Sequence, residues 1–243
     1  MFDKPWYKNI LLTGQPWCGK STLLDKIIQP IQDKEGILTK QLLDEEGQRT
    51  GFEIEYSGKC AFPLASRTKI TPLLFANKRY IQTTGLQSIT ANTKRDIGTV
   101  LYLDEIAPMQ LYVPEFATFA SKVLDSDNPV LGTIKQDNLG YGFINKVKAR
   151  RDCLILTLDD TTRPSIEAFL QALARKLQKS QNYLQEHWRF RKVSTHNVIM
   201  QSEHGERILH RKKEMRYCDC KYYVQYHTCS HSIALRQIYY RLP

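Results

Sequence analysis

The sequence lacks several features that would indicate particular classes of protein. No apolar run in its 243 residues approaches the length of roughly 20 residues that a membrane-spanning helix needs. Its first ten residues, MFDKPWYKNI, lack the apolar stretch of a signal peptide. Internal repeats and low-complexity tracts are also absent. We therefore expect a cytoplasmic protein with one full core and enough further chain for a small second unit.

Acidic residues are scarce in the last part of the chain. Residues 175–243 hold 14 of the 35 Lys and Arg but 5 of the 25 Asp and Glu, which gives +9, against +1 for residues 1–174. All six histidines and three of the six cysteines lie there too. This change of composition predicts a domain boundary near residue 180. Because disulfides are rare in a reducing cytosol, the clustered Cys and His indicate a metal site.

Strand-like and helical segments alternate between residues 8 and 178. We expect buried strands at 8–13, 99–106, 129–135 and 153–158, a hairpin from 36–43 and 50–58, and helices at 21–32, 114–125, 143–152 and 164–178. Residues 70–98 are ambiguous, with some helical character at 74–80. The alternation predicts an α/β fold whose mostly parallel sheet is covered by helices on both faces.

A phosphate-binding loop follows the first strand. The segment GQPWCGKST fits G-x-x-x-x-G-K-[ST], with a predicted strand before it and a predicted helix after it. Backbone N–H groups of such a loop point at phosphate oxygens, and the helix N-terminus adds partial positive charge. The lysine reaches the β- and γ-phosphates and the serine hydroxyl coordinates Mg²⁺. The predicted nucleotide-binding residues are Gly14, Gln15, Pro16, Trp17, Cys18, Gly19, Lys20, Ser21 and Thr22.

A second motif, TVLYLDEI, places two acids at the end of a buried strand. Phosphates bind at the carboxyl edge of an open parallel sheet, where these acids would lie. Asp104 is the predicted partner of Ser21 in holding Mg²⁺, and Glu105 is predicted to orient or deprotonate an attacking water. We take Lys20, Asp104 and Glu105 as the candidate catalytic residues.

Five segments together resemble one family of small P-loop nucleoside-triphosphatases. They are GQPWCGKSTLL, ILTKQLLDEEGQRTGFEIEYSG, LYLDEIAPMQLY, PVLGTIK and RRDCLILTLDDTTRP, within residues 8–176. The family became known first from thermophiles, and it includes the animal cancer-related nucleoside-triphosphatases. The resemblance implies hydrolysis of nucleoside triphosphates with little base selectivity, and a fold close to adenylate-kinase-like and RecA-like proteins. It also implies that Arg163 lies near the nucleotide.

The chain departs from the family pattern at the site. Trp17 stands where the family usually has Gly, and Ala107-Pro108 replaces the usual Gly-Lys. Gln110 occupies a position where Glu is common. The resemblance therefore supports nucleotide binding more directly than it supports fast turnover.

Near the C-terminus, Cys218, Cys220, Cys229 and His231 form the pattern C-x-C-x8-C-x-H. A spacing of two on an extended strand puts the first pair on one face, and the second pair can complete a tetrahedral Cys₃His site that suits Zn²⁺. Four protein ligands leave no open position, so we expect a structural metal. His227 is a lower-ranked substitute for His231.

This pattern resembles a SWIM-type zinc finger, a small ββα-like zinc-binding domain, over residues 193–243. We divide the chain into a P-loop domain at 1–178, a basic linker or loosely packed helix at 179–192, and the finger. SWIM modules bind DNA or proteins. Arg211-Lys212-Lys213 and Arg216, beside Tyr217, Tyr222 and Tyr223, would suit a nucleic-acid backbone with some stacking, with protein docking as the alternative.

The leading interpretation is a Mg²⁺-dependent enzyme that hydrolyses ATP, GTP or another nucleoside triphosphate, joined to a zinc finger that recruits nucleic acid or protein. A nucleotide or nucleoside kinase of the same fold is one alternative, although no Arg-rich lid is evident. A nucleic-acid-binding protein regulated by nucleotide occupancy is the other. Base preference, oligomeric state and pathway are not encoded in these motifs.

Overall fold

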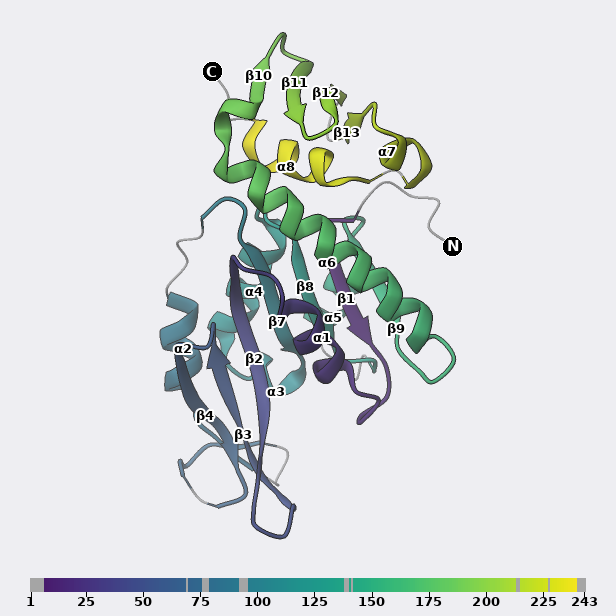
Figure 1. The fold of residues 1–243 in the computed structure, drawn as a ribbon. Coiled ribbons are helices and arrows are strands. Elements are labelled where there is room, and N and C mark those ends of the chain that lie inside the picture. The colour runs from purple at the N-terminus through teal and green to yellow at the C-terminus, as the bar shows by residue number, and fades with distance from the viewer. Residues whose placement is uncertain are drawn as a thin grey trace.

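The computed structural model describes residues 7–68, 70–75, 79–91, 96–137, 140, 142–212, 215–226 and 228–239. Two units are joined by one long helix, α6 (Arg163–Gln185), which crosses the large α/β unit and ends under the small one (Figure 1). The expected mostly parallel α/β architecture of the first unit is confirmed. Among the described residues, no helix is long and apolar enough to cross a membrane.

The centre of the large sheet consists of parallel strands. They lie in the order β2 (Lys34–Leu43), β7 (Val100–Ile106), β8 (Val130–Ile134), β1 (Asn9–Thr13) and β9 (Cys153–Thr157). Every residue of β1 and β8 is buried. Such near-continuous apolar runs are expected of strands that helices cover on both faces.

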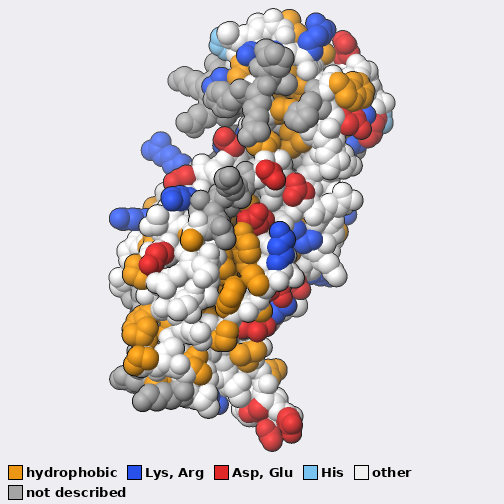
Figure 2. Space-filling view, turned by 90° about the vertical axis from the view of Figure 1, so that its left-hand side faces the viewer, with side chains coloured by type: hydrophobic (Ala, Val, Ile, Leu, Met, Phe, Trp, Pro, Cys, Tyr) orange, Lys and Arg blue, Asp and Glu red, His pale blue; other side chains and the backbone are white. Residues whose placement is uncertain are grey.

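An antiparallel extension continues the sheet beyond β2. It contains β3 (Arg49–Tyr56), β4 (Cys60–Ser66), β6 (Arg79–Ile81) and β5 (Leu74–Phe75), in that spatial order. The β2–β3 hairpin is as expected, and its acidic tip extends at the lower end of the molecule in Figure 2. The helical character expected at 74–80 was wrong where the chain is described, because these residues pair with β4 and with each other as strands. A seven-residue pattern cannot reveal such long-range pairing.

Helices cover both faces of the sheet. α2 (Thr84–Ala91), α4 (Pro114–Asp125) and α5 (Gly142–Lys148) pack on one face, and α1 (Lys20–Ile28) and α6 pack on the other. A one-turn helix, α3 (Pro108–Leu111), follows β7. Apolar residues of α4, such as Phe116, recur at helical spacing and lie in the first core, whereas Leu24 and Leu170 lie in the second.

The small unit is a four-stranded antiparallel sheet with two helices. Its elements are η1 (His187–Arg189), β10 (Phe190–Lys192), β11 (Asn197–Ser202), β12 (Gly205–Lys212), β13 (Met215–Cys218), α7 (Lys221–Tyr226) and α8 (Ser230–Ile238). An antiparallel hairpin forms between β11 and β12. α8 packs against both the sheet and α6.

The segment 179–192 was expected to be a basic linker or a loosely packed helix, and its first part is helical and packed. α6 continues through Gln185, and Ser180, Gln181, Tyr183 and Leu184 are buried. Polar composition suggested a solvated segment, but these side chains face the junction between the two units. The helix is stabilised there by contacts that the local sequence does not reveal.

The two units share a packed junction. Ile233 of α8 is fully buried within the apolar cluster formed by α1, α6 and the sheet. The amide of Gln181 donates to the carbonyls of Asp33 and Gly98 at 2.6 and 2.9 Å. Because Gly98 lies two residues before β7, the junction is at the opposite end of β7 from Asp104 and Glu105.

Candidate functional site

The P-loop joins β1 to α1 and depends on glycine at both of its ends. Gly14 has φ +149°, and a Cβ there would lie 2.5 Å from the Leu158 carbonyl oxygen. Gly19 has φ +77° and forms the left-handed N-cap of α1. These are conformations that residues with a side chain rarely adopt. The loop therefore requires the two glycines that define the motif.

The loop residues differ in their exposure. Gln15, Pro16 and Trp17 are exposed, Cys18, Gly19 and Lys20 are half-buried, and Ser21 and Thr22 lie exposed in the first turn of α1. The Lys20 ammonium donates to the carbonyls of Gly14 and Gln15, both at 3.1 Å. The lysine thus lies along the inside of its own loop, where phosphate oxygens would compete for the same donors.

Asp104 lies at the end of β7 and is 2 % exposed. The hydroxyls of Ser21, at 2.9 Å, and Thr133 both donate to its Oδ1. Burial raises the pKa of Asp104, while the two hydroxyl hydrogen bonds and the nearby Lys20 charge act in the opposite direction. The structure thus brings together the serine of the P-loop and the acid of the second motif, 83 residues apart.

Sequence reasoning did not link three residues to Asp104, and it noted one of them, Gln110, only as a departure from the family pattern. The Thr39 hydroxyl donates to the Asp104 backbone carbonyl, and the Gln110 amide donates to the Thr39 hydroxyl at 3.0 Å. Thr133 is the third. Because β2 and β8 flank β7, their threonines lie beside its carboxyl end. In the sequence, each of these apolar strands contains a threonine. The threonines could not be assigned to the site without knowing that their strands lie next to β7.

Glu105 is half-buried, and no hydrogen bond or ion pair of its side chain is found among the residues that the structure describes. Burial raises its pKa, the neighbouring Asp104 charge raises it further, and Lys20 and Lys135 lower it. Its carboxylate therefore has no partner in the described part of the chain and lies in the field of Lys20.

Arg163 supports the P-loop from outside. It is the first residue of α6, and its guanidinium donates to the carbonyl of Cys18. A Cβ on Gly19 would lie 3.0 Å from its Nη2. Contact between Arg163 and a bound nucleotide stays a prediction, but the arginine already fixes the backbone that would bind phosphate.

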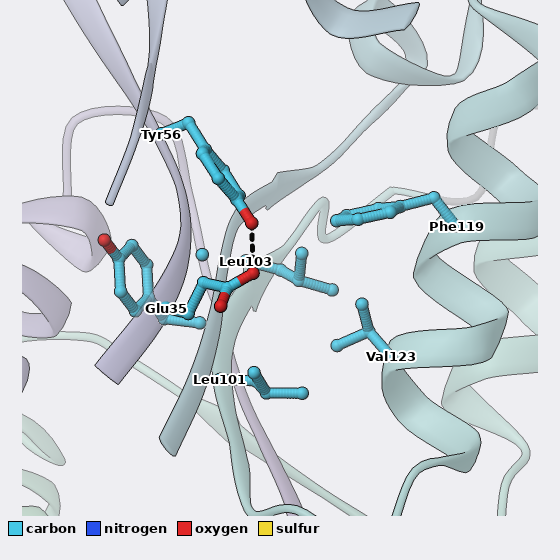
Figure 3. A pocket seen from close by; sticks show the side chains of 8 residues that line it. Glu35, Tyr56, Leu101, Leu103, Phe119 and Val123 are labelled. Carbon is cyan, nitrogen blue, oxygen red and sulfur yellow. Dashed lines mark hydrogen bonds between the residues drawn. The ribbon is translucent and has the colours of Figure 1, made fainter. Parts of the chain in front are cut away.

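A shallow apolar pocket lies elsewhere, between β2, β7 and α4 (Figure 3). Leu101, Leu103, Phe119 and Val123 line it, and the Tyr56 hydroxyl donates to Glu35 at its edge. Glu35 is near the amino end of β2, whereas the P-loop follows the carboxyl end of β1. This pocket is therefore at the opposite edge of the sheet from the nucleotide-site residues.

The four predicted zinc ligands converge in the small unit. One ligand atom from each of Cys218, Cys220, Cys229 and His231 lies within 4.8 Å of all the others, and all four side chains are buried or nearly so. His231 Nδ1 is 3.6 Å from the Cys218 sulfur. Its other ring nitrogen, Nε2, lies 3.4 Å from the Tyr183 hydroxyl of α6.

The residues proposed to contact nucleic acid are only partly available. Tyr223 is 9 % exposed and packs edge-on to Tyr217 in the apolar cluster of the small unit, so it is not free to stack on a base. The Arg211 guanidinium lies 4.7 Å from the Tyr239 ring. Lys213 and His227 lie outside the described residues, as do the side chains of Lys212, Arg216 and Tyr222.

The first unit of the chain is similar to known proteins. A family profile described as NTPase matches residues 9–170. Nucleoside-triphosphatase THEP1 of Thermotoga sp. (strain RQ2) is 30 % identical over 165 residues, covering 65 % of this chain and 90 % of the relative. The corresponding protein of Thermofilum pendens is 30 % identical over 159 residues, covering 62 % and 86 %.

Two solved structures show the same fold. One is THEP1 from Aquifex aeolicus, with a TM-score of 0.59 and 21 % identity, covering 68 % of this chain and 98 % of that chain. The other is a human cancer-related nucleoside triphosphatase, with a TM-score of 0.56 and 20 % identity, covering 71 % of this chain and 98 % of that chain. The profile match ends before the Cys/His cluster. With most of its first unit matched and its P-loop and Asp104 joined in one site, the chain belongs to the NTPase family, whose members are enzymes that hydrolyse nucleoside triphosphates.

Proposed function

We propose that this chain hydrolyses nucleoside triphosphates to diphosphate and phosphate, with Mg²⁺ held by Ser21 and Asp104. The observation that carries the proposal is the 2.9 Å contact between the Ser21 hydroxyl and the Asp104 carboxylate beside the P-loop. A hydroxyl and a carboxylate oxygen are the hard donors that Mg²⁺ prefers, so this donor set fits the ion. When bound, Mg²⁺ would neutralise charge on the β- and γ-phosphates.

The remaining chemistry is assigned to the protein. The Lys20 ammonium leaves the carbonyls of Gly14 and Gln15 and donates to phosphate oxygens, where it stabilises the charge that develops as the β–γ bridge breaks. Glu105 orients a water molecule and accepts a proton from it as the water oxygen bonds to the γ-phosphorus. The bridging oxygen departs with the diphosphate. Glu105 suits the role of general base because its carboxylate has no partner among the described residues.

The test is phosphate release by the full chain and by Lys20→Ala and Glu105→Gln. Both variants should lose most of their turnover, and Glu105→Gln should still bind nucleotide. Glu35→Gln is a matched control, because Glu35 lies at the other edge of the sheet. Wild-type turnover in both site variants would contradict the proposal. A phosphorylated acceptor formed from mixed nucleotides, instead of free phosphate, would identify a kinase.

We also propose that the Cys/His cluster holds a structural Zn²⁺. Three thiols and one imidazole are the donors of common structural zinc sites, and a tetrahedral ion with Zn–S bonds of about 2.3 Å separates its ligand atoms by a little under 4 Å. The convergence within 4.8 Å fits that set without a large rearrangement. A unit of this size also buries little apolar surface, so a metal would contribute much of its stability.

The finger is proposed to recruit nucleic acid or a protein to the NTPase unit, within the cytoplasm. The positive charge of residues 175–243 supports a nucleic-acid partner, whereas the burial of Tyr223 reduces the stacking surface. Titration of labelled DNA and RNA at several salt concentrations tests this. Binding that weakens steeply with salt would support a phosphate-backbone contact, and no binding at low salt would leave a protein partner.

A further inference from the structure

Four side chains beside the P-loop alternate between aromatic rings and guanidinium groups. The Arg49 guanidinium carbon lies 5.0 Å from the centroid of the Trp17 ring and 5.1 Å from that of Phe52, and the Arg79 guanidinium carbon lies 5.3 Å from the Phe52 ring. We call Trp17, Arg49, Phe52 and Arg79 the arginine ladder. It links the middle of the P-loop to β3 and β6 of the antiparallel extension.

The cations of the ladder have no anionic partner in the part of the protein that the structure describes. Within the described residues, neither Arg49 nor Arg79 takes part in an ion pair, and the Nε of each is inaccessible to solvent without a hydrogen-bond partner. Arg150 shows the contrast, since it contacts the carboxylates of Asp125 and Asp152. A structural arginine is paired in this way, whereas the ladder leaves its donors for another molecule.

A third arginine increases the concentration of positive charge. Arg67 follows β4, and its backbone N–H donates to the Thr50 carbonyl at 2.8 Å, next to Arg49 in sequence. Burial lowers the pKa of Arg79, and the charges of Arg49 and Arg67 lower it further. A bound anion would offset this repulsion between like charges.

The position of Trp17 indicates which anion this is. Trp17 lies in the middle of the loop whose backbone would surround the phosphates, and its side chain is 73 % exposed and therefore open to solvent. The Arg49 guanidinium carbon is 5.0 Å from the centroid of this ring, so the arginine lies next to the phosphate-binding loop. The planar fork of a guanidinium is well suited to phosphate oxygens.

We propose that the arginine ladder is the binding site for the terminal phosphate of the bound nucleoside triphosphate, with Arg49 as the contacting group. Arg49 donates to γ-phosphate oxygens and stabilises the charge that accumulates there during transfer to water, the role that a cis-acting arginine serves in other P-loop enzymes. Trp17, whose ring Arg49 contacts, acts through Arg49 as a positioning residue. This inference rests on the proposed NTPase function and names a further catalytic residue for it.

The test compares binding of a non-hydrolysable triphosphate and of a diphosphate, together with kcat, in Arg49→Ala, Arg49→Lys and wild type. Arg49→Ala should weaken triphosphate binding by roughly tenfold or more, as expected for a lost charged hydrogen bond, and should change diphosphate binding less than twofold. It should also lower kcat. Arg175→Ala, an exposed arginine of α6, is the matched control and should match wild type.

Trp17 variants test the positioning role. Trp17→Phe keeps a ring beneath Arg49 and should keep most of the preference for the triphosphate. Trp17→Gly removes the ring and should lose part of that preference. Because Trp17 has φ +70°, glycine fits the backbone better than tryptophan, so the loss would not reflect a misfolded loop.

Three results would overturn the inference. The first is unchanged triphosphate binding and kcat in Arg49→Ala, and the second is equal weakening of triphosphate and diphosphate. The third is that Arg49→Ala loses oligonucleotide binding but binds nucleotide normally. That result would mean that the arginine ladder binds a phosphate of a nucleic acid and not the terminal phosphate of the bound nucleotide. If Lys20→Ala abolishes hydrolysis while Arg49→Ala does not, the NTPase function stands and only this inference fails.

Discussion

The Ser21 hydroxyl donates to the Asp104 carboxylate at 2.9 Å, which joins the first turn of α1 to the carboxyl end of β7. The contact exists although β8 lies between β1 and β7 in the sheet. Thr133 of that intervening strand donates to the same carboxylate oxygen. The sheet order therefore makes Asp104 the common acceptor of two adjacent elements and the centre of the proposed site.

Asp104→Asn should nearly abolish hydrolysis. The amide keeps the size of the side chain but removes the negative charge proposed to hold Mg²⁺, so kcat should fall by roughly a hundredfold or more. Phosphate release measured across a Mg²⁺ titration checks this. The exposed Asp127 gives the control Asp127→Asn. Equal turnover and equal Mg²⁺ dependence in both variants would contradict the assigned role.

Tyr183→Phe should weaken zinc binding while leaving the fold intact. The ring would still stack on His231, but the hydroxyl near His231 Nε2 would be lost. Hydrogen bonds to the second nitrogen of a ligating histidine orient the ring, and their loss costs about tenfold in metal affinity. Competition with a chelator measures the change, with Tyr112→Phe as the control. Metal content near zero in wild type would instead contradict the zinc site itself.

Ile233→Ala should destabilise the NTPase unit although Ile233 belongs to the C-terminal unit. The side chain is 0 % exposed in the core formed with α1 and α6, so its truncation should cost about 2–5 kcal/mol. Urea unfolding followed by circular dichroism checks this. Val224→Ala, on an exposed position of α7, should cost little. Identical midpoints for both variants would mean that the two units are not packed as described.

Asp152→Asn should destabilise the protein at neutral pH but not in acid. Burial alone would raise the pKa of Asp152, but the Arg150 hydrogen bond and charge outweigh it, so the net effect lowers that pKa. A carboxyl with a depressed pKa in the folded state stabilises the fold above its unfolded pKa of about 3.9 and loses that contribution as pH falls through the folded value.

The free energies of unfolding of wild type and Asp152→Asn should therefore differ at pH 7 and converge below pH 4. Asp137→Asn, at an exposed position, serves as the control. A difference that stays constant across this range would show that the carboxylate charge is not what stabilises the network with Arg150.

The sequence alone predicted the local elements that its own residues encode. Gly14 and Gly19 can adopt backbone conformations that other residues avoid, and the apolar run before Asp104 is long enough for one buried strand. Both motifs are therefore legible without a structure. The same holds for the spacing of Cys218 and Cys220, since side chains two apart on an extended chain share a face.

Only the tertiary structure decided what surrounds these motifs. Thr39 and Thr133 contact Asp104 because of the strand order, which depends on long-range pairing. α6 extends past residue 178 because its polar end packs at a junction with elements from later in the sequence. The stacking of Arg49 on Trp17 likewise joins segments 32 residues apart. Local pattern determined the loop, the acid and the ligand spacing, whereas the packing of distant strands determined which side chains complete the site.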